Sequence, residues 1–147
     1  MSLINKLMED MKTSMRNKDT IRKNTITMVR AAVKQIEVDD RRILSDEEIE
    51  DIISKQLKEK RIVIEEFKKG SREDLVQLTL AEIDILLDYL PKQLSYDEVK
   101  AVVIETIAEV NATSMKDIGL IMKSVMPKVK GKTDGNIVNK AIKEVLN

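Results

Sequence analysis

The sequence contains no cysteine and no histidine. Disulfides, a cysteine nucleophile, a histidine general base and the usual zinc sites are therefore excluded. Any catalysis would have to use Asp, Glu, Lys, Ser, Thr or Tyr side chains. Aromatic residues make up only 2% of the chain, namely Phe67, Tyr89 and Tyr96. That scarcity disfavours RNA modules that read bases by stacking them on aromatic rings.

Glycine and proline are also scarce, with four and two copies in 147 residues. Few turns and long periodic segments together predict an all-α fold. No apolar run approaches the roughly 18–20 residues that cross a bilayer, so no membrane partner is expected. The first residues lack the basic segment and apolar core of a signal peptide, and without cysteine nothing indicates secretion. A cytoplasmic location is the resulting expectation.

Charge is balanced overall but unevenly distributed. The chain has 26 basic and 26 acidic residues. Residues 1–44 carry a net charge of +4, residues 45–110 carry −8 and residues 111–147 carry +4. The basic ends could attract an anionic ligand, or the blocks could attract one another within the fold.

Residues 1–91 are expected to form an N-terminal four-helix bundle-like domain. Its helices should begin after Ser2, at Thr20, at the capping box Ser45-Asp-Glu-Glu48 and at Ser71-Arg-Glu-Asp74. Gly70 is expected to take the left-handed conformation after the third helix. The fourth helix should be the most apolar. Its predicted core stripe is Val76, Leu80, Ile83, Leu87 and Leu90, widened by Leu75, Leu78 and Leu86.

Two groups of charged residues in this region have structural explanations. Acids crowd the start of the third helix, where they complement the helix dipole, so no metal site is predicted. Basic residues of the second helix lie outside its apolar stripe and are interpreted as a solvated face rather than an RNA contact. They are Arg22, Lys23, Arg30 and Lys34.

Residues 92–147 are expected to form a small C-terminal three-helix domain. A second capping box, Ser95-Tyr-Asp-Glu98, begins its first helix. Ser114 and Asp117 should cap the next helix, and Pro127 should end it. Gly119 in that helix costs about 1 kcal/mol relative to alanine. Such a cost suggests either close approach of another group or a simple surface position.

The most suggestive stretch lies between the last two expected helices. Lys128, Lys130 and Lys132 alternate around Gly131, and Asp134 is placed to cap the following helix. Backbone N–H groups at a helix start and nearby ammonium groups both attract anions. The stretch is therefore either an anion-binding loop or an ordinary solvated turn with lysines that favour solubility.

Four segments of the chain resemble the YqeY family. They are Glu9-Asp-Met-Lys-Thr-Ser-Met-Arg16, Thr27-Met-Val-Arg-Ala-Ala-Val-Lys34, Glu82-Ile-Asp-Ile-Leu-Leu-Asp-Tyr-Leu-Pro-Lys-Gln-Leu-Ser95 and residues 118–143. The most specific matches are Tyr-Leu-Pro-Lys-Gln-Leu-Ser and Met-Pro-Lys-Val-Lys-Gly-Lys-Thr-Asp-Gly. The resemblance implies an N-terminal helical bundle and a C-terminal domain similar to the tail of the B subunit of tRNA-dependent amidotransferases.

In those enzymes the tail helps to hold the tRNA, and the family label is carbon–nitrogen ligase with glutamine as amido-N-donor. This chain lacks the kinase or transamidation core, a cysteine glutaminase and a Ser-Ser-Lys amidase stretch. The resemblance thus implies tRNA holding and gives almost no support for catalysis by the isolated chain, so a glutamine-dependent carbon–nitrogen ligase stays open only as a third alternative. No catalytic residue and no cofactor is predicted.

Two binding functions remain open at this point. The first is a module that holds the backbone of tRNA or another structured RNA. Its candidate residues are Lys123, Lys128, Lys130, Gly131, Lys132 and Lys140. The second is an adaptor that docks on an amidotransferase or a translation factor, with the acidic middle helices as the contact surface.

Overall fold

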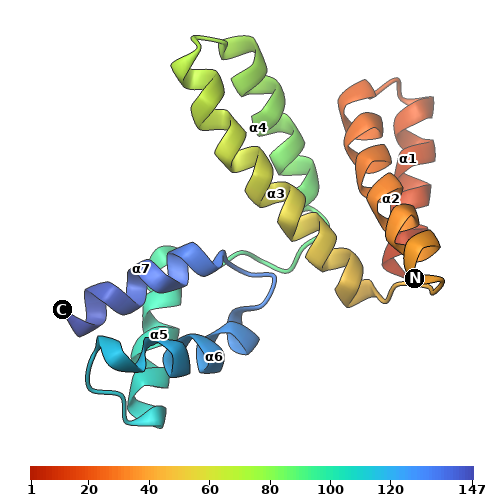
Figure 1. The fold of residues 1–147 in the computed structure, drawn as a ribbon. Helices are drawn as coiled ribbons and strands as arrows, with labels where there is room; N and C mark the ends of the chain where they lie inside the picture. The colour runs from red at the N-terminus through yellow and green to blue at the C-terminus, as the bar shows by residue number, and fades with distance from the viewer. The chain divides into compact units, whose positions relative to one another are not determined.

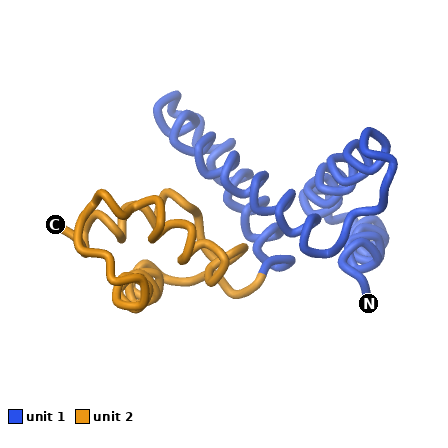
Figure 2. The backbone as a smooth tube through the Cα atoms, turned by 60° about the horizontal axis from the view of Figure 1, so that its bottom comes forward, with its two compact units in different colours: residues 1–90 blue, residues 91–147 orange.

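A computed structural model describes residues 1–147. The chain contains seven α-helices, one 3-10 turn and no strand, as the all-α prediction requires. It separates into two compact units, Met1–Leu90 and Pro91–Asn147 (Figure 2). No helix combines the length and apolar character needed to cross a bilayer.

Unit 1, Met1–Leu90, consists of two antiparallel helix pairs (Figure 1). The first pair is α1 (Leu3–Arg16) with α2 (Thr20–Asp40), and the second is α3 (Asp46–Lys69) with α4 (Glu73–Leu87). Helix α2 also contacts α3 and α4, which joins the two pairs. One apolar core runs through all four helices. It includes Leu7, Ile26, Ile53 and Leu86, each at most 1% exposed.

Local side-chain bonds begin the helices of unit 1 largely where the sequence indicates. Ser2 accepts a hydrogen bond from the Asn5 N–H, and Asp19 accepts one from the Arg22 N–H. Ser45 and Glu48 form the predicted reciprocal capping box. Arg42 donates to the Glu48 carboxylate, and this bond lowers the pKa of that carboxyl to about 2.

The turn between α3 and α4 differs from the prediction. Gly70 has φ −84°, and the left-handed residue is Ser71, with φ 57°. The Arg72 N–H donates to the Phe67 carbonyl across this turn. Ser71 takes the left-handed conformation of the turn, and its side chain does not cap α4. Arg72 is the N-cap of α4 without a side-chain bond to the backbone, so the predicted Ser71 capping motif is wrong.

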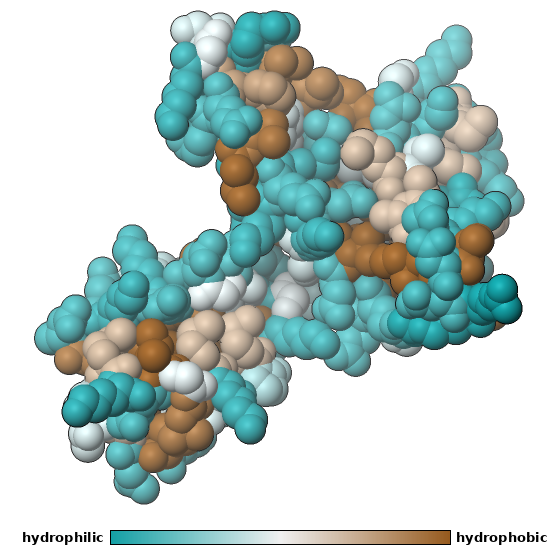
Figure 3. All heavy atoms as spheres, viewed as in Figure 1, coloured by the Kyte–Doolittle hydropathy of each residue, from teal (hydrophilic) through white to brown (hydrophobic).

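The apolar stripe of α4 is also narrower than predicted. Leu78 is 40% exposed and Leu80 is 42% exposed, whereas Val76, Ile83 and Leu86 are buried. Thr79 is buried instead, with its hydroxyl donating to the Leu75 carbonyl. A helix as apolar as α4 offers several alternative faces, and its packing against α2 and α3 selects one of them. Figure 3 shows apolar patches among the hydrophilic side chains of the visible surface.

Unit 2, Pro91–Asn147, consists of α5 (Tyr96–Val110), the 3-10 turn η1 (Met115–Asp117), α6 (Ile118–Val129) and α7 (Gly135–Leu146). Helix α5 packs against both α6 and α7. Eight fully buried side chains form the core of unit 2, which is separate from that of unit 1. They are Val99, Val103, Ile121, Val125, Val129, Val138, Ala141 and Ile142.

Both ends of α6 depart from the prediction. Ser114 caps the 3-10 turn η1 instead, whereas Asp117 is the N-cap residue of α6 as predicted but makes no side-chain bond to the helix backbone. Pro127 lies inside α6, which continues to Val129. Proline keeps a helical φ but lacks a backbone donor, which by itself favours a helix end. The helix nevertheless continues for two residues to Val129, whose side chain is 0% exposed and belongs to the core of unit 2.

Gly119, in the first turn of α6, has open space around it. A Cβ added there would have no atom within 4 Å. The surface interpretation of this glycine therefore holds. We expect Gly119→Ala to raise the free energy of unfolding by up to about 1 kcal/mol, because alanine loses less backbone entropy in a helix. Chemical denaturation followed by circular dichroism measures the change.

Gly131→Ala is the matched control for this substitution. Gly131 has φ +74°, a conformation that costs an alanine roughly 1–2 kcal/mol. The same chemical change should therefore destabilise the protein at Gly131. Loss of stability in the Gly119 variant would contradict the account of α6.

Candidate nucleic-acid interface

The loop between α6 and α7 has a firmly held backbone. The Gln93 side-chain amide donates to the Gly131 carbonyl at 2.7 Å. The Leu94 N–H donates to the Lys132 carbonyl at 2.9 Å. The ring of Pro91 lies against Gly131, with its Cδ 3.7 Å from the position of an added Cβ. The segment that precedes α5 thus fixes the loop from outside.

The start of α7 matches the prediction, with a consequence for anion binding. The Asp134 carboxylate accepts a hydrogen bond from the Asn136 N–H at 2.8 Å. The Asp134 carbonyl accepts from the N–H groups of Ile137 and Val138. A carboxylate already occupies the place that an anionic ligand would take at this helix start. Anion binding here must therefore depend on lysine side chains.

Lys128 belongs to the scaffold rather than to the loop. It lies in the last turn of α6, contrary to the predicted loop position. Its ammonium group donates to the Thr106 hydroxyl at 2.9 Å and pairs with the Glu109 carboxylate at 2.8 Å. The hydrogen bond from Lys128 lowers the pKa of Glu109. This lysine ties α6 to α5, which sequence reasoning did not foresee.

The remaining candidate lysines lie on α6, the loop and α7. Lys123 is exposed on α6, Lys130 is exposed at the α6 C-terminus and Lys132 is half-buried in the loop. Lys140 is exposed on α7, with its ammonium 5.4 Å from the centre of the Tyr96 ring. Neither Lys123 nor Lys132 forms an ion pair. These two side chains can therefore meet an external anion without first breaking an internal pair.

Lys143 was missed by the sequence prediction. It is exposed on α7 three residues after Lys140, and residues at that spacing lie on the same helix face. Asn136 and Asn139 precede these lysines on the same face. The i, i+3, i+4, i+7 spacing of 136, 139, 140 and 143 was the available signal. Helix α7 thus presents Lys140, Lys143 and the amide of Asn136 together, while the side-chain oxygen of Asn139 is buried.

A second cluster of side chains fastens α7 to α5. The Tyr96 hydroxyl donates to the Glu144 carboxylate, and Lys100 pairs with the same carboxylate at 3.7 Å. The hydrogen bond to Glu144 raises the pKa of Tyr96 to about 12. With Lys140 above its ring, Tyr96 is engaged at both its face and its hydroxyl. Stacking on a nucleotide base would require this arrangement to come apart.

The basic face predicted on α2 is only partly solvated. Arg22 pairs with Asp88 at 3.4 Å. Arg30 is half-buried: its Nε atom is buried without a hydrogen-bond partner, and its Nη1 lies 3.1 Å from the sulfur of Met11. Lys23 and Lys34 are exposed, as predicted. The pair with Asp88 and the contact with Met11 of α1 therefore decide which of these basic residues contact water.

Comparison with known proteins identifies relatives along nearly the whole chain. A family model described as Yqey-like protein matches residues 4–146. The protein named Altered inheritance of mitochondria protein 41, mitochondrial, from Pyrenophora tritici-repentis is 31% identical over 147 residues. The match covers 96% of this chain and 79% of the relative. The protein of the same name from Kluyveromyces lactis is 33% identical over 131 residues, covering 86% of this chain and 69% of the relative.

These names contradict the expected cytoplasmic location. Both relatives are designated mitochondrial. The expectation depended on the lack of cysteine and of a secretory leader, and neither property separates the cytoplasm from the interior of an organelle. The expectation was therefore wrong, because the lack of cysteine and of a secretory leader does not indicate the cytoplasm.

The family match covers residues from α1 to α7, and the two relatives share about a third of their aligned residues with the chain. The protein belongs to the YqeY family.

Proposed function

We propose that the protein is a non-catalytic module that holds the phosphate backbone of tRNA or a similarly structured RNA. The proposed contacts are Lys123, Lys132 and Lys140, with Lys130, Gly131 and Lys143 beside them. The observation that carries the proposal is the loop at Gly131, which is fixed by Gln93 and Leu94. A fixed backbone limits the entropy lost when lysines from two helices engage one ligand.

The chemistry of these side chains favours phosphates over bases. Lysine is a compact point charge that suits phosphate oxygens, and such contacts position a protein without reading sequence. Tyr96, the aromatic residue of unit 2, is already engaged by Lys140 and Glu144. Binding should therefore depend on salt and only weakly on nucleotide sequence.

The proposed link to amidotransferases depends on the resemblance of unit 2 to their tRNA-holding tail. Under this proposal a partner enzyme would carry out amide transfer, and this chain would hold the RNA.

The pKa shifts support a structural role for the charged groups affected. Glu98 has its pKa lowered by its capping bond to Ser95, and Glu109 has its pKa lowered by Lys128.

The test is the affinity for bulk tRNA of a variant with Lys123, Lys132 and Lys140 changed to alanine. Each lost phosphate contact should reduce the slope of log affinity against log salt by about 1. We expect much weaker binding at low salt and only a small loss of thermal stability, because none of the three makes an ion pair and the contact of Lys140 with the Tyr96 ring is exposed. Fluorescence anisotropy measures the affinity.

The matched control changes Lys12, Lys55 and Lys69 to alanine. These three are exposed lysines of unit 1, so the net charge changes by the same amount. If both triple variants bind tRNA equally well, net charge rather than the α6–α7 surface determines affinity, and the proposal fails.

Exposed apolar side chains support a second candidate, an adaptor for a protein of the translation or amidotransferase machinery. Ile62 on α3 is 56% exposed, and Leu78 and Leu80 on α4 are at least 40% exposed. Such side chains occur at protein contacts when they adjoin one another. Capture of a defined partner that ribonuclease does not release, and that Leu78→Ser weakens, would favour the adaptor.

A further inference from the structure

A hollow of about 380 Å³ lies in unit 1 between α1 and α2. These two helices pack against each other and run side by side in Figure 1. Three apolar and three charged side chains line the hollow, together with Thr27. They are Ile4, Ala31, Val33, Arg30, Lys34 and Glu37. The volume is near the lower end for ligand sites, so a small molecule is the appropriate scale of ligand.

The two cations of the hollow have no carboxylate partner within the protein. Neither Arg30 nor Lys34 forms an ion pair. The acceptor that the Arg30 guanidinium does contact is the sulfur of Met11, 3.1 Å from Nη1, and a thioether is a weak acceptor. Arg30 is also half-buried. A half-buried cation attracts an anion more strongly than an exposed one, because water screens it less.

Glu37 sets the charge of the hollow. Its Oε2 atom accepts a hydrogen bond from the Leu44 N–H at 3.0 Å, which holds the carboxylate in place. Two cations and one carboxylate leave a net charge of +1, which a single monoanion balances. The Thr27 hydroxyl donates to the Lys23 carbonyl at 2.7 Å, so it supplies no further donor. A doubly charged anion would therefore find few donors and one opposing carboxylate.

We propose that this hollow binds a small aliphatic monocarboxylate. The ligand carboxylate accepts from Arg30 and Lys34, and its hydrocarbon chain lies against Ile4 and Ala31. The guanidinium fork of arginine matches the two oxygens of a carboxylate. Lys34 adds a second positive charge four residues further along the same face of α2. Positive charge beside an apolar lining is the complement of a molecule with one anionic end and one apolar end.

Other small ligands match the hollow less well. An aliphatic amine would meet the net positive charge with a charge of the same sign. A neutral alcohol would leave Arg30 and Lys34 without an anion. Inorganic phosphate has more charge than the hollow balances, and it has no hydrocarbon to cover the apolar lining. An RNA backbone lacks such a hydrocarbon too, so this site does not depend on the proposed RNA binding by unit 2.

The first experiment titrates the full chain with hexanoate, 1-hexanol, hexylamine and inorganic phosphate at neutral pH, at concentrations up to about 10 mM. Titration calorimetry measures the affinities. We expect hexanoate to bind at least about tenfold more tightly than the other three, the ratio for losing one charge-assisted hydrogen bond. The proposal is overturned if hexanoate shows no saturable binding, or if hexanol or phosphate binds equally well.

The second experiment removes each cation in turn. Arg30→Met and Lys34→Met keep an unbranched side chain, and each should lower the affinity for hexanoate at least about fivefold. Thermal stability should change little, because neither residue forms an ion pair. The matched controls are Arg61→Met and Lys23→Met, which remove the same charge from exposed positions outside the hollow. Equal losses in a variant and its control would mean that net charge, rather than this site, determines binding.

The third experiment uses Glu37→Gln, whose expected effect has the opposite sign. Glutamine keeps an oxygen that can accept from the Leu44 N–H but removes the negative charge from the hollow. The affinity for hexanoate should rise at least about threefold, whereas Glu9→Gln, at an exposed position of α1, should leave it unchanged. An unchanged or lower affinity of the Glu37 variant would contradict the assignment of the hollow.

Nuclear magnetic resonance locates the ligand independently of these variants. Adding hexanoate to the unmodified chain should shift the methyl signals of Ile4, Ala31 and Val33, which line the hollow. The methyl signals of Ile104, exposed in unit 2, should stay in place. Shifts confined to residues outside α1 and α2 would overturn the proposal.

Discussion

Replacing Ile142 by alanine is expected to lower the free energy of unfolding by about 2–5 kcal/mol, the range for truncating a fully buried isoleucine. Ile142 is 0% exposed and belongs to the core of unit 2 with Val138 and Val103. Helix α7 is held to α5 largely by this core, so the proposed tRNA binding should weaken together with stability. Chemical denaturation followed by far-ultraviolet circular dichroism measures the effect.

Ile104→Ala is the control on the same unit. Ile104 is 52% exposed on α5, and exposed substitutions usually change stability by no more than about 0.5 kcal/mol. Comparable losses from the two substitutions would mean that the apolar face of α7 is not where the structure places it.

Replacing Tyr89 by phenylalanine is expected to cost about 1–3 kcal/mol near neutral pH, the cost of losing a partly buried hydrogen bond to a carboxylate. The Tyr89 side chain is 6% exposed, and its hydroxyl donates to Asp10 Oδ2 at 2.5 Å. This bond joins the end of the α4 segment to α1, 79 residues apart in sequence. Thermal and chemical denaturation measure the loss.

The same tyrosine predicts how stability changes in alkaline solution. Burial, and then the hydrogen bond to Asp10, raise the pKa of Tyr89 well above that of an unfolded tyrosine, which is about 10. The unfolded chain therefore loses this proton first as pH rises. The contribution of Tyr89 is complete below about pH 10 and declines above it.

Tyr89→Phe should remove that part of the alkaline decline, whereas Tyr96→Phe should remove only the separate part that belongs to Tyr96, whose pKa is also raised. An identical alkaline profile for the wild type and the Tyr89 variant would contradict the buried bond to Asp10.

The sequence predicted best those features that depend on neighbouring residues. The capping boxes of Ser45 with Glu48 and Ser95 with Glu98 are confirmed. Each needs only residues three apart, so its geometry follows from the local helix start. The N-cap at Asp134 is confirmed for the same reason.

The errors arose where packing between distant segments decides the outcome. The sequence predicts a loop position for Lys128, but its ammonium group pairs with Glu109 of α5, 19 residues away. Pro127 reads as a helix end, but α6 continues past it to the buried Val129. Leu80 fits an apolar stripe, yet α2 and α3 bury a different face of α4.

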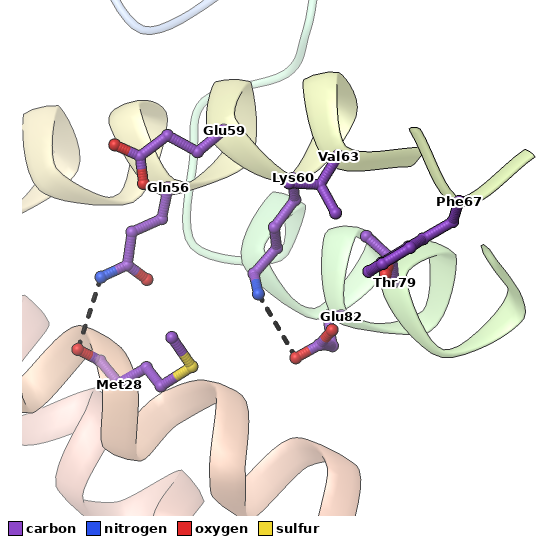
Figure 4. A pocket seen from close by; sticks show the side chains of 8 residues that line it. All are labelled: Met28, Gln56, Glu59, Lys60, Val63, Phe67, Thr79 and Glu82. Atoms are coloured by element: carbon purple, nitrogen blue, oxygen red, sulfur yellow. Dashed lines mark hydrogen bonds and ion pairs between the residues drawn. The ribbon is translucent and has the colours of Figure 1, made fainter. Parts of the chain in front are cut away.

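The ion pair between Lys60 and Glu82 in unit 1 (Figure 4) was beyond sequence reasoning for a similar reason. Lys60 and Glu82 are 22 residues apart on different helices, and each taken alone reads as a surface charge. Sequence patterns thus located the helices, whereas the pairing of charged groups on different helices could be identified only from the folded structure.

The most direct test of the proposed role is the salt dependence of tRNA binding by the unmodified chain. With three to four lysine–phosphate contacts, a plot of log affinity against log salt should have a slope near −3. A slope near zero, or no binding at low salt, would contradict the proposal that the lysines of α6, the loop and α7 hold an RNA backbone.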